Sequence, residues 1–228
     1  MSTRSHVIVG ALLLTVGALA FWSAEAVSAG AWSNPAFSFH NDVISDLRDP
    51  VSNDYLYGHV VNSPLSFGMN CGFVVDVILY GVADFLLHSL FSERRRIAVL
   101  MSGVLVAVGL VVISVLHEQS VNAAEMAMHW IGAFLILGDA IAVGLVGVFA
   151  GRANASMWYR ILSIGIGIVI FVSFMSLVTV PSLAVDLGAG TMERTAMWGA
   201  PVWQVVTEIV LLVGASHLGT LTKEGDSR

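Results

Sequence analysis

Long apolar runs separated by short polar segments recur along the whole chain. A helix rises about 1.5 Å per residue, so about 20 apolar residues are needed to cross a hydrocarbon layer about 30 Å thick. Six stretches reach this length, at approximately 7–29, 62–90, 97–116, 124–150, 161–185 and 195–218. The pattern predicts an all-α integral membrane protein: a six-transmembrane-helix bundle that forms a single polytopic domain over residues 1–228.

Composition and charge narrow the class of protein further. Hydrophobic residues make up 57% of the chain and charged residues only 11%, whereas soluble domains carry about 25% charged residues. This excludes a water-soluble globular domain. The net charge of -6, without a basic stripe, argues against nucleic-acid binding. The single cysteine, Cys71, excludes a disulfide within the chain.

The distribution of Lys and Arg predicts the direction of the spans, because cytoplasmic loops carry the excess of these residues. With the N-terminus inside, eight basic residues are cytoplasmic: Arg4, Arg94, Arg95, Arg96, Arg152, Arg160, Lys223 and Arg228. Only Arg48 and Arg194 lie outside, so both termini are predicted to be cytoplasmic. An alternative is that the first span is a cleaved signal peptide ending near Ala24-Glu25-Ala26, which leaves five spans.

This direction places an unusual share of chemically active side chains on the outer side. They come from three separate loops: His40, Asn41, Ser45 and Asp46 from the first, His117 and Glu125 to His129 around the second, and Glu193 and Arg194 from the third. A carboxylate next to an imidazole can orient the ring, or the two can share a metal ion. Asp46, His129 and Glu193 are therefore candidate ligands for a divalent metal such as zinc.

The same residues have structural interpretations. Acids such as Glu125 and Glu193 are favoured at helix N-termini, and His40 can be an ordinary solvated loop residue. Arg194 is the natural ionic partner for Asp46 or for an anionic ligand.

A second set of acids lies deeper. Asp76, Asp139 and Glu208 are predicted at a common depth in the second, fourth and sixth spans, with no Lys or Arg beside them. Such a layer suits a proton-coupled transporter. The alternative is that each acid is satisfied locally on a different face of the bundle. Asp84 and His88 are expected nearer the inner surface.

The chain resembles the bacterial six-helix membrane proteins catalogued as domain of unknown function 998. The resemblance rests on Asn41-Asp42-Val43-Ile44-Ser45-Asp46-Leu47, the Asn62 to Gly72 opening of the second span, His129, and Gly190-Thr191-Met192-Glu193-Arg194 before Trp198. It implies six helices, a polar outer cluster and a multi-pass protein of the bacterial plasma (inner) membrane, and it implies no settled activity.

Three hypotheses of function follow. The first is an outward-facing pocket that binds a lipid-like or small amphipathic molecule, with hydrolysis or transfer as candidate reactions. Asp46 and His129 are the acid/base or metal-ligand pair, Glu193 orients or coordinates, and Arg194 holds an anionic head group. Further ligand-binding candidates are His40, Asn41, Ser45, Asn62, His117 and Glu125. The second hypothesis is a proton-coupled small-molecule transporter that uses the intramembrane acids, and the third is a noncatalytic membrane scaffold.

The predicted direction can be tested with a single introduced cysteine. In an Asn41→Cys variant with Cys71→Ala, a membrane-impermeant thiol reagent added to intact cells should label the protein, because residue 41 is predicted to face outward. Labelling that occurs only after the membrane is broken contradicts the assignment.

Overall fold

A computed structural model describes residues 3–33, 35–49, 55–56, 59–61, 63–90, 93–116, 123–150 and 155–225. Six helices in this part of the chain are long and apolar enough to cross a membrane. They are Arg4–Ala31, Ser66–Leu87, Arg96–Val115, Ala123–Phe149, Met157–Thr179 and Ala189–Gly214. The predicted all-α architecture with six spans is therefore confirmed, and the chain is a multi-pass membrane protein.

The described chain has nine α-helices, of which all but α7 belong to the six spans. They are α1 (Thr3–Ala31), α2 (Ser66–Leu87), α3 (Glu93–Val115), α4 (Ala123–Ile136), α5 (Gly138–Phe149), α6 (Met157–Thr179), α7 (Pro181–Leu187), α8 (Ala189–Met197) and α9 (Gly199–Gly225). Two 3₁₀ segments, η1 (Ser45–Arg48) and η2 (His88–Leu90), lie before and after α2. Strands β1 (Tyr55–Leu56) and β2 (His59–Val60) pair antiparallel.

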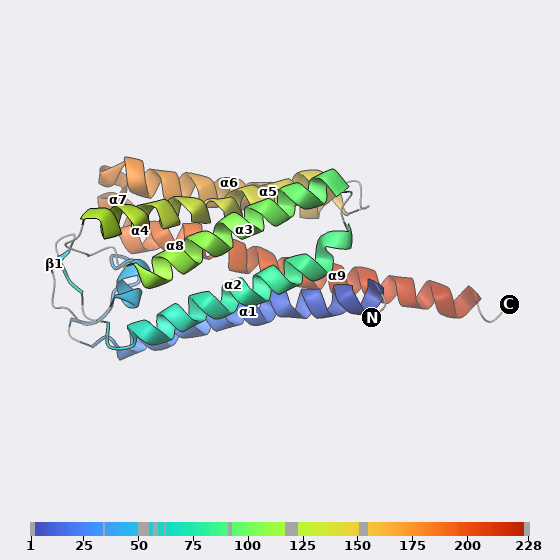
Figure 1. Cartoon of the computed structure of the whole chain (residues 1–228), viewed down its shortest axis with the longest axis horizontal. Helices are drawn as coiled ribbons and strands as arrows, with labels where there is room; N and C mark the ends of the chain where they lie inside the picture. The colour runs from blue at the N-terminus through green and yellow to red at the C-terminus, as the bar shows by residue number, and fades with distance from the viewer. Residues whose placement is uncertain are drawn as a thin grey trace.

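The helices form two layers (Figure 1). Helix α1 packs along α2 and α9, while α3 packs on α4 and α5 packs on α6. Strand β1 and η1 lie at one end of the bundle and both chain termini at the other. We call these the hairpin end, formed by residues 35–49, β1, β2, α7 and α8, and the termini end. The hairpin end is the one that the arginine distribution predicts to face outward.

Two predicted boundaries differ from the structure. The fifth span was expected to reach residue 185, but α6 ends at Thr179 and Pro181 begins a separate helix, because proline lacks the N–H that would continue the hydrogen-bond ladder. The last span was expected to begin at residue 195, but α8 already begins at Ala189. Gly188, with φ of 81°, makes the turn between α7 and α8.

Glycines permit close helix contacts at several crossings. A Cβ atom on Gly167 of α6 would lie 2.7 Å from the carbonyl oxygen of Ala140 on α5. One on Gly147 would lie 2.7 Å from the carbonyl oxygen of Arg160. Small residues let helix backbones approach in this way within membranes. By contrast, a Cβ atom on Gly165 meets nothing within 4 Å.

The two glycines of α6 therefore form a matched pair of variants. Gly167→Ala should destabilise the protein by about 1–3 kcal/mol, because the added methyl group forces α5 and α6 apart. Gly165→Ala should leave stability unchanged. Thermal unfolding of the two variants in the same detergent measures the difference, and equal melting temperatures would contradict the packing of α5 on α6.

Candidate functional site

A buried ion pair joins the first and last spans at the hairpin end. Arg194 of α8 donates from Nε to Oε1 of Glu25 in α1 over 2.7 Å, and both side chains are almost fully buried. The indole Nε1 of Trp198 donates to the other carboxylate oxygen over 2.7 Å. Arg194 Nη1 also donates to the carbonyl oxygens of Phe39 and Asp42, each over 2.8 Å. One guanidinium thus holds α1, α8 and the loop after α1 together.

The start of α8 is joined to the same loop by hydrogen bonds. Glu193 accepts the backbone N–H groups of Ile44 and, over 3.4 Å, Ser45, so it satisfies donors at the start of η1. Thr191 donates its backbone N–H to the carbonyl oxygen of His40 over 3.1 Å. Nδ1 of His40 and Oγ1 of Thr191 also lie 3.0 Å apart.

Arg48 fixes the other end of η1 on helix α2. Its Nε donates to Oδ1 of Asn70 over 3.1 Å, and the Asn70 amide donates back to the carbonyl oxygen of Arg48 over 3.2 Å. The guanidinium carbon lies 5.3 Å from the centre of the Phe73 ring, within the range of a cation–π contact. Only 2% of Arg48 is exposed, so a positive charge is held within the wall of the bundle.

His129 is positioned by the end of the preceding span. Its Nδ1 lies 2.9 Å from the carbonyl oxygen of Leu116. A carbonyl can only accept, so Nδ1 carries the hydrogen, and in the neutral ring Nε2 is then the acceptor nitrogen. The imidazole ring stands edge-on to Trp130, with the ring centres 6.4 Å apart.

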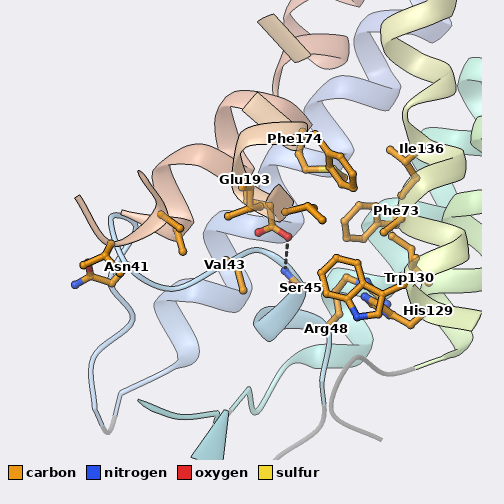
Figure 2. A pocket seen from close by; sticks show the side chains of 18 residues that line it. Asn41, Val43, Ser45, Arg48, Phe73, His129, Trp130, Ile136, Phe174 and Glu193 are labelled. Atoms are coloured by element: carbon orange, nitrogen blue, oxygen red, sulfur yellow. Dashed lines mark hydrogen bonds between the residues drawn. The ribbon is translucent and has the colours of Figure 1, made fainter. Parts of the chain in front are cut away.

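Some of these groups line a cavity of about 620 Å³, which we call the hairpin-end cavity. Its polar lining residues are Asn41, Ser45, Arg48, His129 and Glu193. Its apolar lining comes from the spans and includes Phe73, Ile113, Trp130, Ile136, Phe174, Leu177 and Met197. Figure 2 shows Glu193, Val43 and Ser45 on one side of the cavity and His129, Trp130 and Ile136 on the other.

The cavity brings together some of the predicted site residues and not others. Asn41, Ser45, His129 and Glu193 line it. The other predicted residues within the described chain lie outside its lining: Asp46, which is 1% exposed, His40, Glu125 and Arg194. Asn62 and His117 are not among the described residues.

The expected pairing of Arg194 with Asp46 is wrong, because the carboxylate partner of Arg194 is Glu25. Glu25 was overlooked because the small residues around it resemble a signal-peptide cleavage site. Its presence as an acid inside an apolar span was the available signal, since such an acid needs a partner. Arg48 was also missed as a lining residue, although it is one of two basic residues on the predicted outer side.

No group of three or more His, Cys, Asp or Glu side chains suited to hold a metal occurs in the described ranges. The zinc interpretation of Asp46, His129 and Glu193 therefore stays a prediction.

The intramembrane acids divide into two groups. Oγ1 of Thr15 in α1 donates to Oε2 of Glu208 in α9. Asp76 instead receives a hydrogen bond from the side chain of Gln204 and interacts electrostatically with Asp139. The expectation of one common layer of three acids is thus replaced by a pair, with Glu208 bound separately.

Comparisons of the chain with models of protein families, with curated proteins and with solved structures find no significant match. The resemblance to domain of unknown function 998 remains a prediction.

The ion pair predicts that Arg194→Met lowers the stability of the protein more than a substitution of its exposed neighbour Thr195 in α8. Arg194→Met should lower the free energy of unfolding by about 3–5 kcal/mol, because it leaves the carboxylate of Glu25 buried without a partner. Adding Glu25→Gln should recover part of this loss, since the remaining charge is removed. The exposed Thr195→Ala variant is the control. Denaturant unfolding in mixed micelles measures these differences, and an Arg194→Met variant as stable as the control would contradict a buried pair.

Proposed function

We propose that the hairpin-end cavity binds a lipid-like or small amphipathic molecule with an anionic head group. The observation that carries the proposal is that one cavity is lined by both polar and apolar side chains. Its volume of about 620 Å³ falls within the range of about 300–1,000 Å³ that is usual for small-molecule sites. The polar groups come from the loop before α2, from α4 and from α8, and most of the apolar groups come from α2, α3, α4, α6, α7 and α8.

The charges in the wall favour an anion at the head-group position. Arg48 supplies the cation within the lining. The carboxylate of Glu193 already accepts two backbone N–H groups, which compensates its charge. Arg194, expected from the sequence to hold the head group, pairs with Glu25 and does not line the cavity. The proposal assigns head-group binding to Arg48, which does line it, with hydrogen bonds from Ser45 and Asn41.

The apolar part of the ligand packs among aromatic and aliphatic side chains. Phe73 of α2, Ile136 of α4 and Phe174 of α6 lie deepest along their helices from the hairpin end. Burial of apolar surface contributes about 25 cal/mol per Å², so the tail supplies much of the binding energy and the head group sets the orientation.

Hydrolysis or transfer at the head group is a proposed reaction that would use His129. With Nδ1 held by the carbonyl of Leu116, the acceptor Nε2 of the neutral ring suits a general base. Loss of intact ligand during the binding assay below would reveal such a reaction, while full recovery of intact ligand limits the function to binding. The proposed location is the bacterial plasma membrane.

A substitution that fills the cavity tests the binding proposal. Ala133 of α4 lines the cavity, whereas Ala127 of the same helix is exposed and outside the lining. Ala133→Leu should weaken binding about tenfold or more, because the added side chain occupies ligand volume. Ala127→Leu should bind like the unmodified protein.

The assay uses purified protein in nanodiscs and a fluorescent derivative of dodecyl phosphate, with the matching dodecyl trimethylammonium probe for comparison. The proposal predicts preference for the phosphate and selective weakening by Ala133→Leu. Equal affinity of both variants, or preference for the cation, would contradict it.

A further inference from the structure

A second cavity, of about 700 Å³, lies at the termini end of the bundle. Its walls are mainly apolar, and its polar lining includes Arg4, Tyr80, Asp84, Tyr159 and Thr207. It shares no lining residue with the hairpin-end cavity. We call it the termini-end cavity.

A row of polar side chains leads from this cavity into the membrane interior along one face of α2. Asp84, Tyr80 and Asp76 are spaced four residues apart, so they lie above one another on the helix. Asp84 and Tyr80 line the termini-end cavity. Asp76 lies one turn deeper, is 8% exposed and is not part of the lining.

Asp76 is the deepest residue of this row, and two buried acceptor oxygens at this position lack a hydrogen-bond donor from the described residues. The Gln204 amide donates to its carboxylate, but Oδ1 of Asp76 and Oε1 of Gln204 have no hydrogen-bond partner within the described part of the chain. Both atoms are buried, and an unpaired buried acceptor is costly. Two such oxygens in one place indicate a site that takes up a hydrogen or a cation.

Asp139, on another helix, interacts electrostatically with Asp76. It lies in the first turn of α5, directly after the turn at Leu137 that separates α4 from α5. The N–H of Leu137 bonds to the carbonyl three residues earlier, at Phe134, over 3.1 Å. Tyr80 interacts electrostatically with both Asp76 and Asp139, so the tyrosine stands near the two acids. A tightened turn inside a helix often marks a functional position.

Among the described residues, the remaining charged and titratable groups of the surrounding helices do not supply a compensating cation to the pair. Glu208 on α9 is bonded to Thr15 of α1, and His88 acts on Asp84 at the end of α2. Arg4 lies in the first turns of α1 at the termini end. Two interacting carboxylates in the membrane interior repel each other when both are charged, so a proton bound by one of them is favoured.

We infer that Asp76 and Asp139 together bind one proton and exchange it with the termini-end cavity along Tyr80 and Asp84. In this step a carboxyl of the pair releases its proton, through the tyrosine hydroxyl and the Asp84 carboxylate, to water in the cavity, and it takes one up by the reverse route. No atoms other than protons move.

The pair and the hairpin-end cavity share no lining residue. Phe73, one turn from Asp76 along α2, lines the hairpin-end cavity, whereas Asp76 and Asp139 do not. The proton site is therefore separate from the proposed ligand site, and its test does not depend on amphiphile binding.

The test is infrared spectroscopy of the purified protein in nanodiscs, which detects the carbonyl band of protonated carboxyl groups. The unmodified protein should show this band at neutral pH. Asp76→Asn or Asp139→Asn should abolish it, whereas Glu208→Gln is the matched control and should retain it. Retention of the band in both Asp variants overturns the proposal, as does its loss in the Glu208→Gln control. A stoichiometric metal cation in place of the band also overturns it.

A second measurement does not depend on removing either acid. Transfer to heavy water should shift the band at a rate set by the route to the cavity. Tyr80→Phe and Asp84→Asn should keep the band and slow its shift, because each removes a proton-carrying group from the row. An unchanged rate in both variants would contradict the proposed route.

Discussion

The buried pair of Glu25 and Arg194 is the interaction on which the hairpin end depends. An ion pair inside a membrane bundle is tolerated only when further hydrogen bonds complete it. Here Trp198 completes the carboxylate, and the carbonyls of Phe39 and Asp42 complete the guanidinium. The pair therefore fixes the loop after α1 against α8, and these two segments line the cavity together with α2, α3, α4, α6 and α7.

The charged side chains at the two ends of the bundle have different partners. At the hairpin end, cations meet carboxylates, carbonyls and aromatic rings, as Arg48 does with Asn70 and Phe73. Toward the termini end, two acids, Asp76 and Asp139, interact with each other. The first arrangement suits an anionic ligand and the second a proton.

The number and type of the spans could be predicted because hydrocarbon imposes length and apolarity on every one of them. Residues 189–194 could not be assigned to a helix, since α8 is polar enough to resemble a loop, and its stability comes from Arg194 reaching Glu25. Grouping Ser45, His129 and Glu193 at one end followed from the direction of the spans. Which of these residues face a common cavity could not be predicted from the sequence, because packing sets the rotation of each segment. Asp46 is buried, whereas its neighbour Ser45 lines the cavity.

The central claim is that the loop after α1 is held against α8, and a disulfide cross-link tests it most directly. The N–H of Thr191 bonds to the carbonyl of His40 over 3.1 Å, which places the two residues within reach of a disulfide. A His40→Cys, Thr191→Cys variant with Cys71→Ala should form an intrachain disulfide on mild oxidation in native membranes. If the folded protein forms no such bond, or forms it only between two copies, this structure of the hairpin end is contradicted.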